Sequence, residues 1–200
     1  MRIDKHKSFI TEDERLSLLS WVSDNKDTYF IDGISRGRDG YKLRTTTRLF
    51  EGSIDYPDLV ASIQSRIMEL YNIPDNLVEK LGESGTIIVI TKPKGDTYSH
   101  TDPILNKGHA VRFNIILQEA DEGGLLFVNN RQIKLSEREL HCYCATRWEH
   151  AVSEVRGDTD RIIIIFGFEI GDDWERGEWS YKIAQDGKEC LNYVGKGLIR

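Results

Sequence analysis

His100 and Asp102 stand two positions apart in the stretch YSHTDPI, shortly after a Gly-Asp step. If this stretch is extended, residues two apart point to the same side of the strand, which brings the imidazole, the carboxylate and the Tyr98 ring together. An imidazole nitrogen and a carboxylate oxygen on one face suit the chelation of a divalent transition metal ion. An ordinary polar turn is the alternative interpretation, because a short motif needs structural context before it indicates a site.

A metal site of this kind needs a third ligand. His150 in RWEHAVSEV is the best placed, because it lies between two predicted strands of the same β-rich half. His109 and His141 compete with it, and a histidine satisfied by hydrogen bonds near a sheet edge is the other interpretation of His150. Two histidines and one carboxylate leave three coordination positions open, as in non-haem Fe(II) centres that bind a cosubstrate and dioxygen together.

The elements that must position these residues begin with a helix. Thr11 and Glu14 match a capping box, and the apolar residues after them recur near helical spacing, which predicts a helix over about 12–24. A second helix is predicted from Pro57 to Asn72, because proline suits a first turn and a row of apolar residues at i, i+4 follows it.

Four further segments of the first 83 residues have recognisable patterns. The segment PDNLVEKLG, 74–82, is expected to form a short third turn or helix. DTYFIDG, 27–33, and YKLRTTTRLF, 41–50, combine aromatic and β-branched residues between turn formers, which predicts two strands joined by a Gly-rich loop. The basic, Gly-rich stretch 35–48 is either a mobile lid over a site or a solvated hairpin.

Short strands dominate from residue 84 onward. They are predicted over 85–92, 109–118, 124–129, 131–135, 140–146 and 160–170, with SYKIA at 180–184 as a further candidate. Asn129 and Asn130 predict a tight turn, since asparagine tolerates left-handed conformations. Helices followed by many antiparallel strands indicate an α+β protein, in which the helices buttress a sandwich or squashed barrel.

Together these residues resemble the Fe(II)/2-oxoglutarate-dependent oxygenases. The resemblance is carried by the pair His100 and Asp102 and by His150. Arg161, eleven residues beyond that second histidine at the start of RIIIIFGF, belongs to the same pattern. The sequence is most similar to the prolyl 4-hydroxylase-type branch, because a tyrosine precedes the His-x-Asp pair, RFNIILQ stands where that branch has its next strand, and EGGLLF precedes the distal histidine. The similarity covers most of residues 84–169.

This resemblance implies a double-stranded β-helix, which is a jelly-roll core of eight strands with iron between its two sheets. The chain would then be a single domain, with a helical buttress and the first strands over 1–83 and the catalytic core over 84–185. The resemblance also implies that His100, Asp102 and His150 bind Fe(II).

The implied activity is oxidative decarboxylation of 2-oxoglutarate by O2 to succinate and CO2, coupled to hydroxylation of an unactivated C–H bond in an amino acid or peptidyl side chain. Ascorbate would stimulate it. Arg161 would bind the distal carboxylate of 2-oxoglutarate, since its planar fork grips a carboxylate bidentately. Relatives nearest prolyl 4-hydroxylase often carry Lys there. Tyr98 would donate its hydroxyl to the cosubstrate. Asp102 favours hydroxylation, because halogenating members have a small residue at that position.

Arg112, Asn114 and Trp148 are the candidate substrate-binding residues. Arg112 and Asn114 share one face of VRFNIIL, so the pair faces either solvent or the cavity, where Arg112 could bind a substrate carboxylate. Trp148, two residues before His150, is either a packing anchor or a substrate clamp.

Composition narrows the functional classes. The 200 residues carry a formal net charge of -6 with no basic block, which disfavours a nucleic acid partner. No apolar run approaches the ~18 residues of a membrane span, and the first residues lack the apolar core of a signal peptide, so we expect a soluble cytoplasmic protein. Cys142, Cys144 and Cys190 are expected to be buried or semi-buried thiols, since no second Cys pair completes a zinc site.

Two other functions are compatible with the sequence. One is a non-catalytic, cupin-like metal or ligand-binding module that retains the barrel. The other is demethylation of nucleic acid by the same chemistry, but that branch pairs its strand arginine with a further Asn and Arg, which RIIIIFG lacks. No pattern in the sequence predicts an oligomeric state.

Overall fold

Two β-sheets form the centre of the protein. This computed structural model describes residues 4–32, 43–47, 54–71, 73, 78–79, 85–102 and 108–171. The large sheet contains β1 (Asp4–His6), β2 (Phe30–Asp32), β3 (Arg44–Thr47), β4 (Val78–Glu79), β5 (Ile87–Thr91), β7 (Gly108–Gln118), β11 (Leu140–Cys144) and β14 (Arg161–Gly171). The small sheet contains β6 (Thr97–His100), β9 (Leu126–Val128), β10 (Arg131–Ile133) and β12 (His150–Val152). A separate pair contains β8 (Glu122–Gly123) and β13 (Val155–Arg156).

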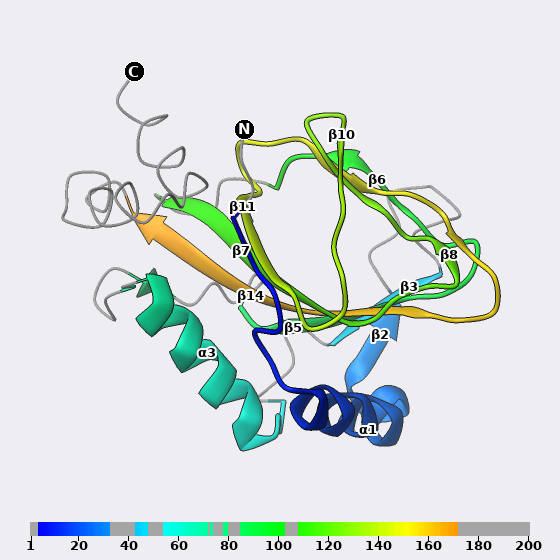
Figure 1. Cartoon of the computed structure of the whole chain (residues 1–200), viewed down its shortest axis with the longest axis horizontal. Coiled ribbons are helices and arrows are strands. Elements are labelled where there is room, and N and C mark those ends of the chain that lie inside the picture. Colours follow the sequence, from blue (N-terminus) through cyan, green and yellow to red (C-terminus); the bar gives the residue numbers. More distant parts are fainter. Residues whose placement is uncertain are drawn as a thin grey trace.

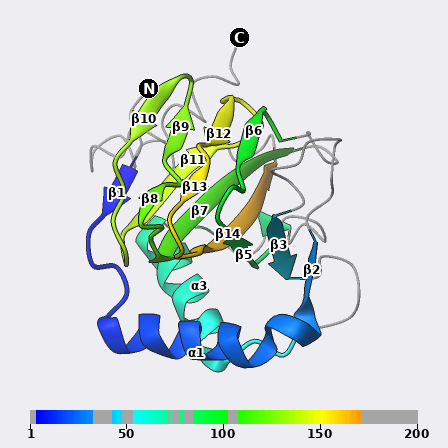
Figure 2. The ribbon, with the colours of Figure 1, turned by 90° about the vertical axis from the view of Figure 1, so that its right-hand side faces the viewer.

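The sheets are stacked, and the helices lie outside them. The large sheet has the order β1-β11-β7-β14-β5-β3-β2, with β4 added to β14, and the small sheet has the order β10-β9-β12-β6. Helices α1 (Glu12–Tyr29) and α3 (Asp58–Tyr71) cover the face of the large sheet that is turned away from the small sheet, as Figures 1 and 2 show. The architecture is therefore the predicted α+β jelly roll with a helical buttress.

Both predicted helices are confirmed. The Thr11 hydroxyl accepts a hydrogen bond from the Glu14 backbone N–H, and the Glu14 carboxylate accepts one from the Thr11 backbone N–H, so the capping box is present. Helix α1 continues to Tyr29, beyond the predicted end at residue 24. The first residues of DTYFIDG are consequently helical, and only Phe30–Asp32 pair with β3 as a strand.

The predicted strands of the second half are confirmed wherever they are described. Asn129 and Asn130 adopt φ values of 48° and 59°, which closes the predicted tight turn between β9 and β10. The predicted short helix at 74–82 is wrong at Val78–Glu79, because these residues pair with the end of the long strand β14. The rest of that segment, the stretch 35–42 and the candidate strand 180–184 lie outside the described residues.

The large sheet separates two apolar layers, because successive side chains of a strand point to opposite faces. The isoleucine run of β14 divides in this way. Ile162 and Ile164 join the main core with residues of both helices, whereas Ile163 and Ile165 join a second cluster with Ile87, Val89 and Ile116. This second cluster faces the small sheet and forms one wall of the space between the sheets.

Cys142 and Cys144 belong to the main core and are buried thiols that form no disulfide, as predicted. The Cys142 sulfur lies 3.9 Å from the Tyr71 hydroxyl of α3, so it points toward the helices and away from the small sheet. Within the described part of the chain, neither helix is long and apolar enough to span a membrane.

Candidate metal centre

Two neighbouring strands of the small sheet bring the three predicted metal ligands together. His100 ends β6 and His150 begins β12, and the two residues are directly opposite each other in the antiparallel pairing. Asp102 follows β6 and is anchored by its backbone N–H, which donates to the Ala145 carbonyl oxygen at 2.9 Å. One carboxylate oxygen of Asp102 lies 3.5 Å from His100 Nε2 and 3.8 Å from His150 Nε2.

These three ligand atoms all lie within 4.8 Å of one another, so the cluster can hold one metal ion. Each imidazole is oriented by a hydrogen bond to the main chain. His100 Nδ1 lies 2.8 Å from the Tyr98 carbonyl oxygen, and His150 Nδ1 lies 3.0 Å from the Trp148 carbonyl oxygen. A carbonyl oxygen only accepts hydrogen bonds, so each Nδ1 must carry the proton. Nε2 is therefore the nitrogen of each ring that faces the centre and is left to bind a metal ion.

Arg112 holds the remaining oxygen of the aspartate. Its Nε and one terminal nitrogen donate to Asp102 Oδ2 at 2.9 Å and 2.7 Å, while Oδ1 faces the two histidines. Arg112 therefore orients the carboxylate through Oδ2, and Oδ1 is the oxygen left to bind a metal ion. This donor set of two imidazoles and one monodentate carboxylate fits a non-haem iron centre with open positions.

The protonation states also suit metal binding. Burial lowers the pKa of His150 to about 4, even though the Asp102 charge acts in the opposite direction, so this imidazole is neutral near neutral pH. Burial alone would raise the pKa of Asp102, but the contact with His100 and the charges of Arg112 and His150 hold it well below its usual range. Metal ligands must be deprotonated, and both groups are.

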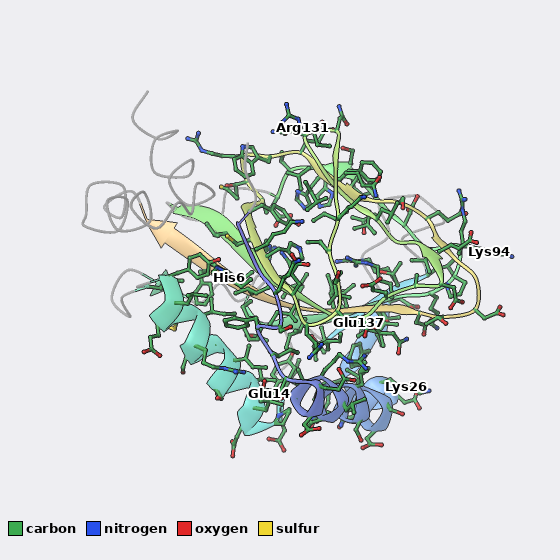
Figure 3. The ribbon with its side chains drawn as sticks, viewed as in Figure 1. His6, Glu14, Lys26, Lys94, Arg131 and Glu137 are labelled. Carbon is green, nitrogen blue, oxygen red and sulfur yellow. The ribbon has the colours of Figure 1, made fainter. Side chains whose placement is uncertain are left out.

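A cavity between the sheets extends from this cluster to Arg161. Its apolar lining comes from both walls: Ile87, Val89, Leu126, Val152, Ile163 and Ile165. Its polar lining beyond the three ligands consists of Arg44, Thr91, Thr97, Arg112, Asn114, His141, Tyr143 and Arg161. Figure 3 shows side chains of the two sheets meeting in the space between them. Arg112 and Asn114 therefore face the cavity, which decides between the two predicted orientations.

Arg161 lies at the buried end of the cavity. Its exposed fraction is 4%, and burial lowers the pKa of its guanidinium to about 10, so it remains charged at neutral pH. Gly124 makes room for it, since a Cβ atom at this position would lie 2.7 Å from Arg161 Cδ. A buried cation at the end of a cavity can bind an anionic group of a ligand.

Tyr98 is placed differently from the prediction. The residues Thr97 and His100 are three apart in β6, but they pair with Val152 and His150, which are two apart in β12. This bulge interrupts the alternation, so Thr97 and His100 line the cavity and Tyr98 does not. The Tyr98 ring instead lies 5.0 Å from the His100 ring. Tyr98 therefore contacts a ligand ring without lining the cavity, and its hydrogen bond to the cosubstrate stays a prediction.

The positions of the side chains also bear on Trp148 and on the two histidines that compete with His150 as the third ligand. Trp148 belongs to the main core and is absent from the cavity lining, so it is a packing anchor whose carbonyl orients His150. His141 lines the cavity but is not part of the ligand cluster. The side chain of His109 lies outside the described residues.

No sequence pattern singled out the cavity residues Tyr143, Thr91 and Arg44. Tyr143 lines the cavity with its ring 5.1 Å from His150, and burial raises its pKa well above the usual range. Thr91 lies beside Arg161, and Arg44 follows on the other side of Thr91 on the same sheet face. Alternation along predicted strands could have found Tyr143, because it follows His141 by two, but Arg44 was indistinguishable from the other basic residues of 35–48.

The fold was compared with known proteins. The chain has a TM-score of 0.62 to the viral collagen prolyl hydroxylase of Paramecium Bursaria Chlorella virus-1, crystallised as a 2OG complex, with 16% identity over 85% of this chain and 97% of that chain. A Pseudomonas putida prolyl-4-hydroxylase gives a TM-score of 0.59, with 12% identity over 84% of this chain and 92% of that chain. The sequence matches no protein-family model and no curated protein significantly. This chain therefore has the prolyl 4-hydroxylase fold.

Proposed function

We propose that this protein is an Fe(II)- and 2-oxoglutarate-dependent oxygenase that hydroxylates an unactivated C–H bond of an amino acid or a peptidyl side chain. One observation carries the proposal. The cluster of His100, Asp102 and His150 opens into a cavity that ends at a buried, charged Arg161. The shared fold with the prolyl hydroxylases supports the same function.

In this proposal, His100 and His150 hold the iron through Nε2 and Asp102 holds it through Oδ1. Iron held there would activate O2, which is the oxidant: one oxygen atom would enter the succinate formed from 2-oxoglutarate with loss of CO2, and the other would enter the hydroxylated product. Arg112 keeps Asp102 Oδ2 engaged, so that the carboxylate occupies a single coordination position. The remaining positions then stay available for the cosubstrate and for dioxygen.

The cavity positions the cosubstrate and excludes water. Arg161 binds the distal carboxylate of 2-oxoglutarate, because this buried guanidinium lines the cavity and a guanidinium can grip a carboxylate bidentately. The isoleucine and valine side chains of the large sheet pack along the aliphatic part of the molecule. A water-poor cavity strengthens both the ion pair and the metal–ligand interactions.

The prime substrate approaches the more exposed end of the cavity, where the side chains of His100 and Asp102 keep 17% and 14% of their surface open. Asn114 offers an amide to it from the cavity wall. Arg112 is already engaged with Asp102, so we assign it first to holding that carboxylate and only second to contacting a substrate.

A succinate-release screen tests the proposed function. The protein with Fe(II), 2-oxoglutarate and ascorbate is incubated with amino acids and peptides, and mass spectrometry follows a gain of one oxygen. We expect substrate-dependent succinate formation in the wild type and none in His150→Ala. A wild-type protein that binds Fe(II) and 2-oxoglutarate but forms neither succinate nor oxidised product across the screen would instead match a non-catalytic, cupin-like module.

A further inference from the structure

A second arginine lies at the buried end of the cavity. Arg44 of β3 is directly opposite Thr91 of β5, and Arg161 of β14 is opposite the same threonine from the other side. Directly opposed residues of neighbouring strands share one sheet face. All three residues line the cavity, so two guanidinium-bearing side chains flank one threonine on its floor.

The two arginines influence each other electrostatically. The pKa of Arg161 is lowered mainly by burial, and the charge of Arg44 adds to this effect, while Tyr143 and Glu119 oppose it. The Arg44 charge also reaches Tyr143, which lies beside His150. Arg44 and Arg161 both line the cavity, so their charges act on the same space. Two neighbouring cations repel each other, and an anionic group of a ligand bound between them would offset that repulsion.

The charges of the cavity lining are unevenly distributed. Among the described lining residues the charged side chains are Arg44, Asp102, Arg112 and Arg161. The carboxylate of Asp102 is bound by Arg112 at the metal end. The opposite end, around Thr91, is lined by cations, so it attracts a negatively charged group of a ligand.

We propose that Arg44 and Arg161 form a two-arginine clamp that binds one carboxylate between them. This inference rests on the proposed function and deepens it, because the ligand must then be a dicarboxylic 2-oxo acid with its keto-acid end at the metal. Two guanidinium groups match the four lone-pair sites of a carboxylate better than one does. The clamp therefore selects against 2-oxo acids that lack the second carboxylate.

A binding titration that does not depend on turnover tests the clamp. The Mn(II)-loaded protein is titrated calorimetrically with 2-oxoglutarate and with 2-oxopentanoate, which has a methyl group in place of the distal carboxylate. We expect the wild type to prefer 2-oxoglutarate. In Arg44→Met this preference should fall about tenfold or more, as expected for the loss of a charge-assisted hydrogen bond, while the affinity for 2-oxopentanoate stays unchanged.

Three further variants make the result specific. Arg161→Met should lose the preference for 2-oxoglutarate as well. In the double variant Arg44→Met/Arg161→Met the fold-loss of preference should be smaller than the product of the two single fold-losses, because both side chains bind one group. Arg44→Lys should keep part of the preference. Arg131→Met should keep all of it, since Arg131 is an exposed residue of β10 at the far side of the small sheet (Figure 3). Thermal unfolding of each variant verifies that it is folded.

The outcomes separate the clamp from the proposed function. If Arg161→Met loses the preference and a folded Arg44→Met or Arg44→Lys keeps the full wild-type preference, the clamp is wrong and the proposed function stands. If the wild type itself does not distinguish 2-oxoglutarate from 2-oxopentanoate, both the clamp and the proposed function are contradicted.

Discussion

At the scale of single residues, each candidate metal ligand is oriented by a second group. Main-chain carbonyls of Tyr98 and Trp148 set the two imidazoles, and Arg112 sets the carboxylate. The two carbonyls belong to residues that the sequence pattern had suggested for cosubstrate and substrate binding. Their backbone contributes to the site, although their side chains do not line the cavity.

The contact between Arg112 and Asp102 leads to the first prediction. Arg112→Met removes both hydrogen bonds to Oδ2 and leaves the carboxylate free to rotate, so we expect Mn(II) affinity to fall by about 10- to 100-fold, as for other groups that orient metal ligands. Electron paramagnetic resonance of free Mn(II) measures this affinity. Arg131→Met is the matched control on an exposed strand. Unchanged affinity in a folded Arg112→Met protein would show that the ion pair does not position the ligand.

His141 leads to a prediction about pH. Burial, together with the charges of Arg161 and Lys5, lowers the pKa of this imidazole from 6.5 to about 3. Between these two pKa values His141 is protonated in the unfolded chain and neutral in the folded chain. Its contribution therefore leaves the free energy of unfolding highest above about pH 6.5 and lowers it as the pH falls. We expect the free energy of unfolding of the metal-free protein to fall by up to about 1.4 kcal/mol per pH unit from this group.

Urea unfolding of the metal-free protein between about pH 7 and about pH 5 measures this loss. His141→Leu removes this titrating group and should reduce the slope of stability against pH, while His150, whose pKa is also lowered, contributes to the slope that remains. The histidines of the ligand cluster are present in both proteins, so they serve as an internal control. Identical slopes for the wild type and the variant would mean that His141 is not a buried neutral imidazole.

At the scale of elements, the turn before β9 and the bulge in β6 shape the cavity. Gly124, at φ +60°, lies against the Arg161 side chain, so its lack of a Cβ is a condition for the position of that cation. The β6 bulge turns both Thr97 and His100 toward the cavity. Strand alternation alone predicts neither effect, because each depends on the neighbouring strand.

Gly124→Ala is the corresponding test. A methyl group 2.7 Å from Arg161 Cδ must displace the arginine, so we expect 2-oxoglutarate affinity to fall about tenfold or more, through the weakened charge-assisted contact. Gly157→Ala is the matched control, because Gly157 also has a positive φ, of +86°, but its Cβ would meet Asp121. Both variants should lose stability, and only Gly124→Ala should lose ligand affinity. An equal affinity loss in the two would indicate a general folding effect.

The N-terminus of α1 carries a prediction about stability alone. Thr11 caps the helix, and the Glu14 carboxylate of the same capping box also pairs with Arg66 of α3 at 2.9 Å, so the box connects the two helices (Figure 3 labels Glu14 between them). Thr11→Ala should cost about 1 kcal/mol of unfolding free energy. Thr11→Ser should retain most of it. Loss of Mn(II) binding in folded Thr11→Ala would contradict a purely structural role.

At the scale of the whole molecule, the order of helices and strands was predictable because local patterns carry it. The isoleucine run of β14 and the capping box at Thr11 are recognisable without tertiary information. The metal cluster was predictable because its residue types are specific and its spacing matches a family resemblance. The place of Arg44 in the cavity lining was not predictable, since it depends on pairing with a strand more than forty residues away and nothing local distinguishes this arginine.

The most direct test of the account is the visible absorption of the anaerobic protein with Fe(II) and 2-oxoglutarate. Chelation of the ion by the keto acid in the three-residue site should produce a weak charge-transfer band in the wild type. The band should be absent in His100→Ala and retained in the control Arg131→Met. A wild-type protein without the band, or a band of full intensity in His100→Ala, would contradict the assignment of these residues as the metal centre.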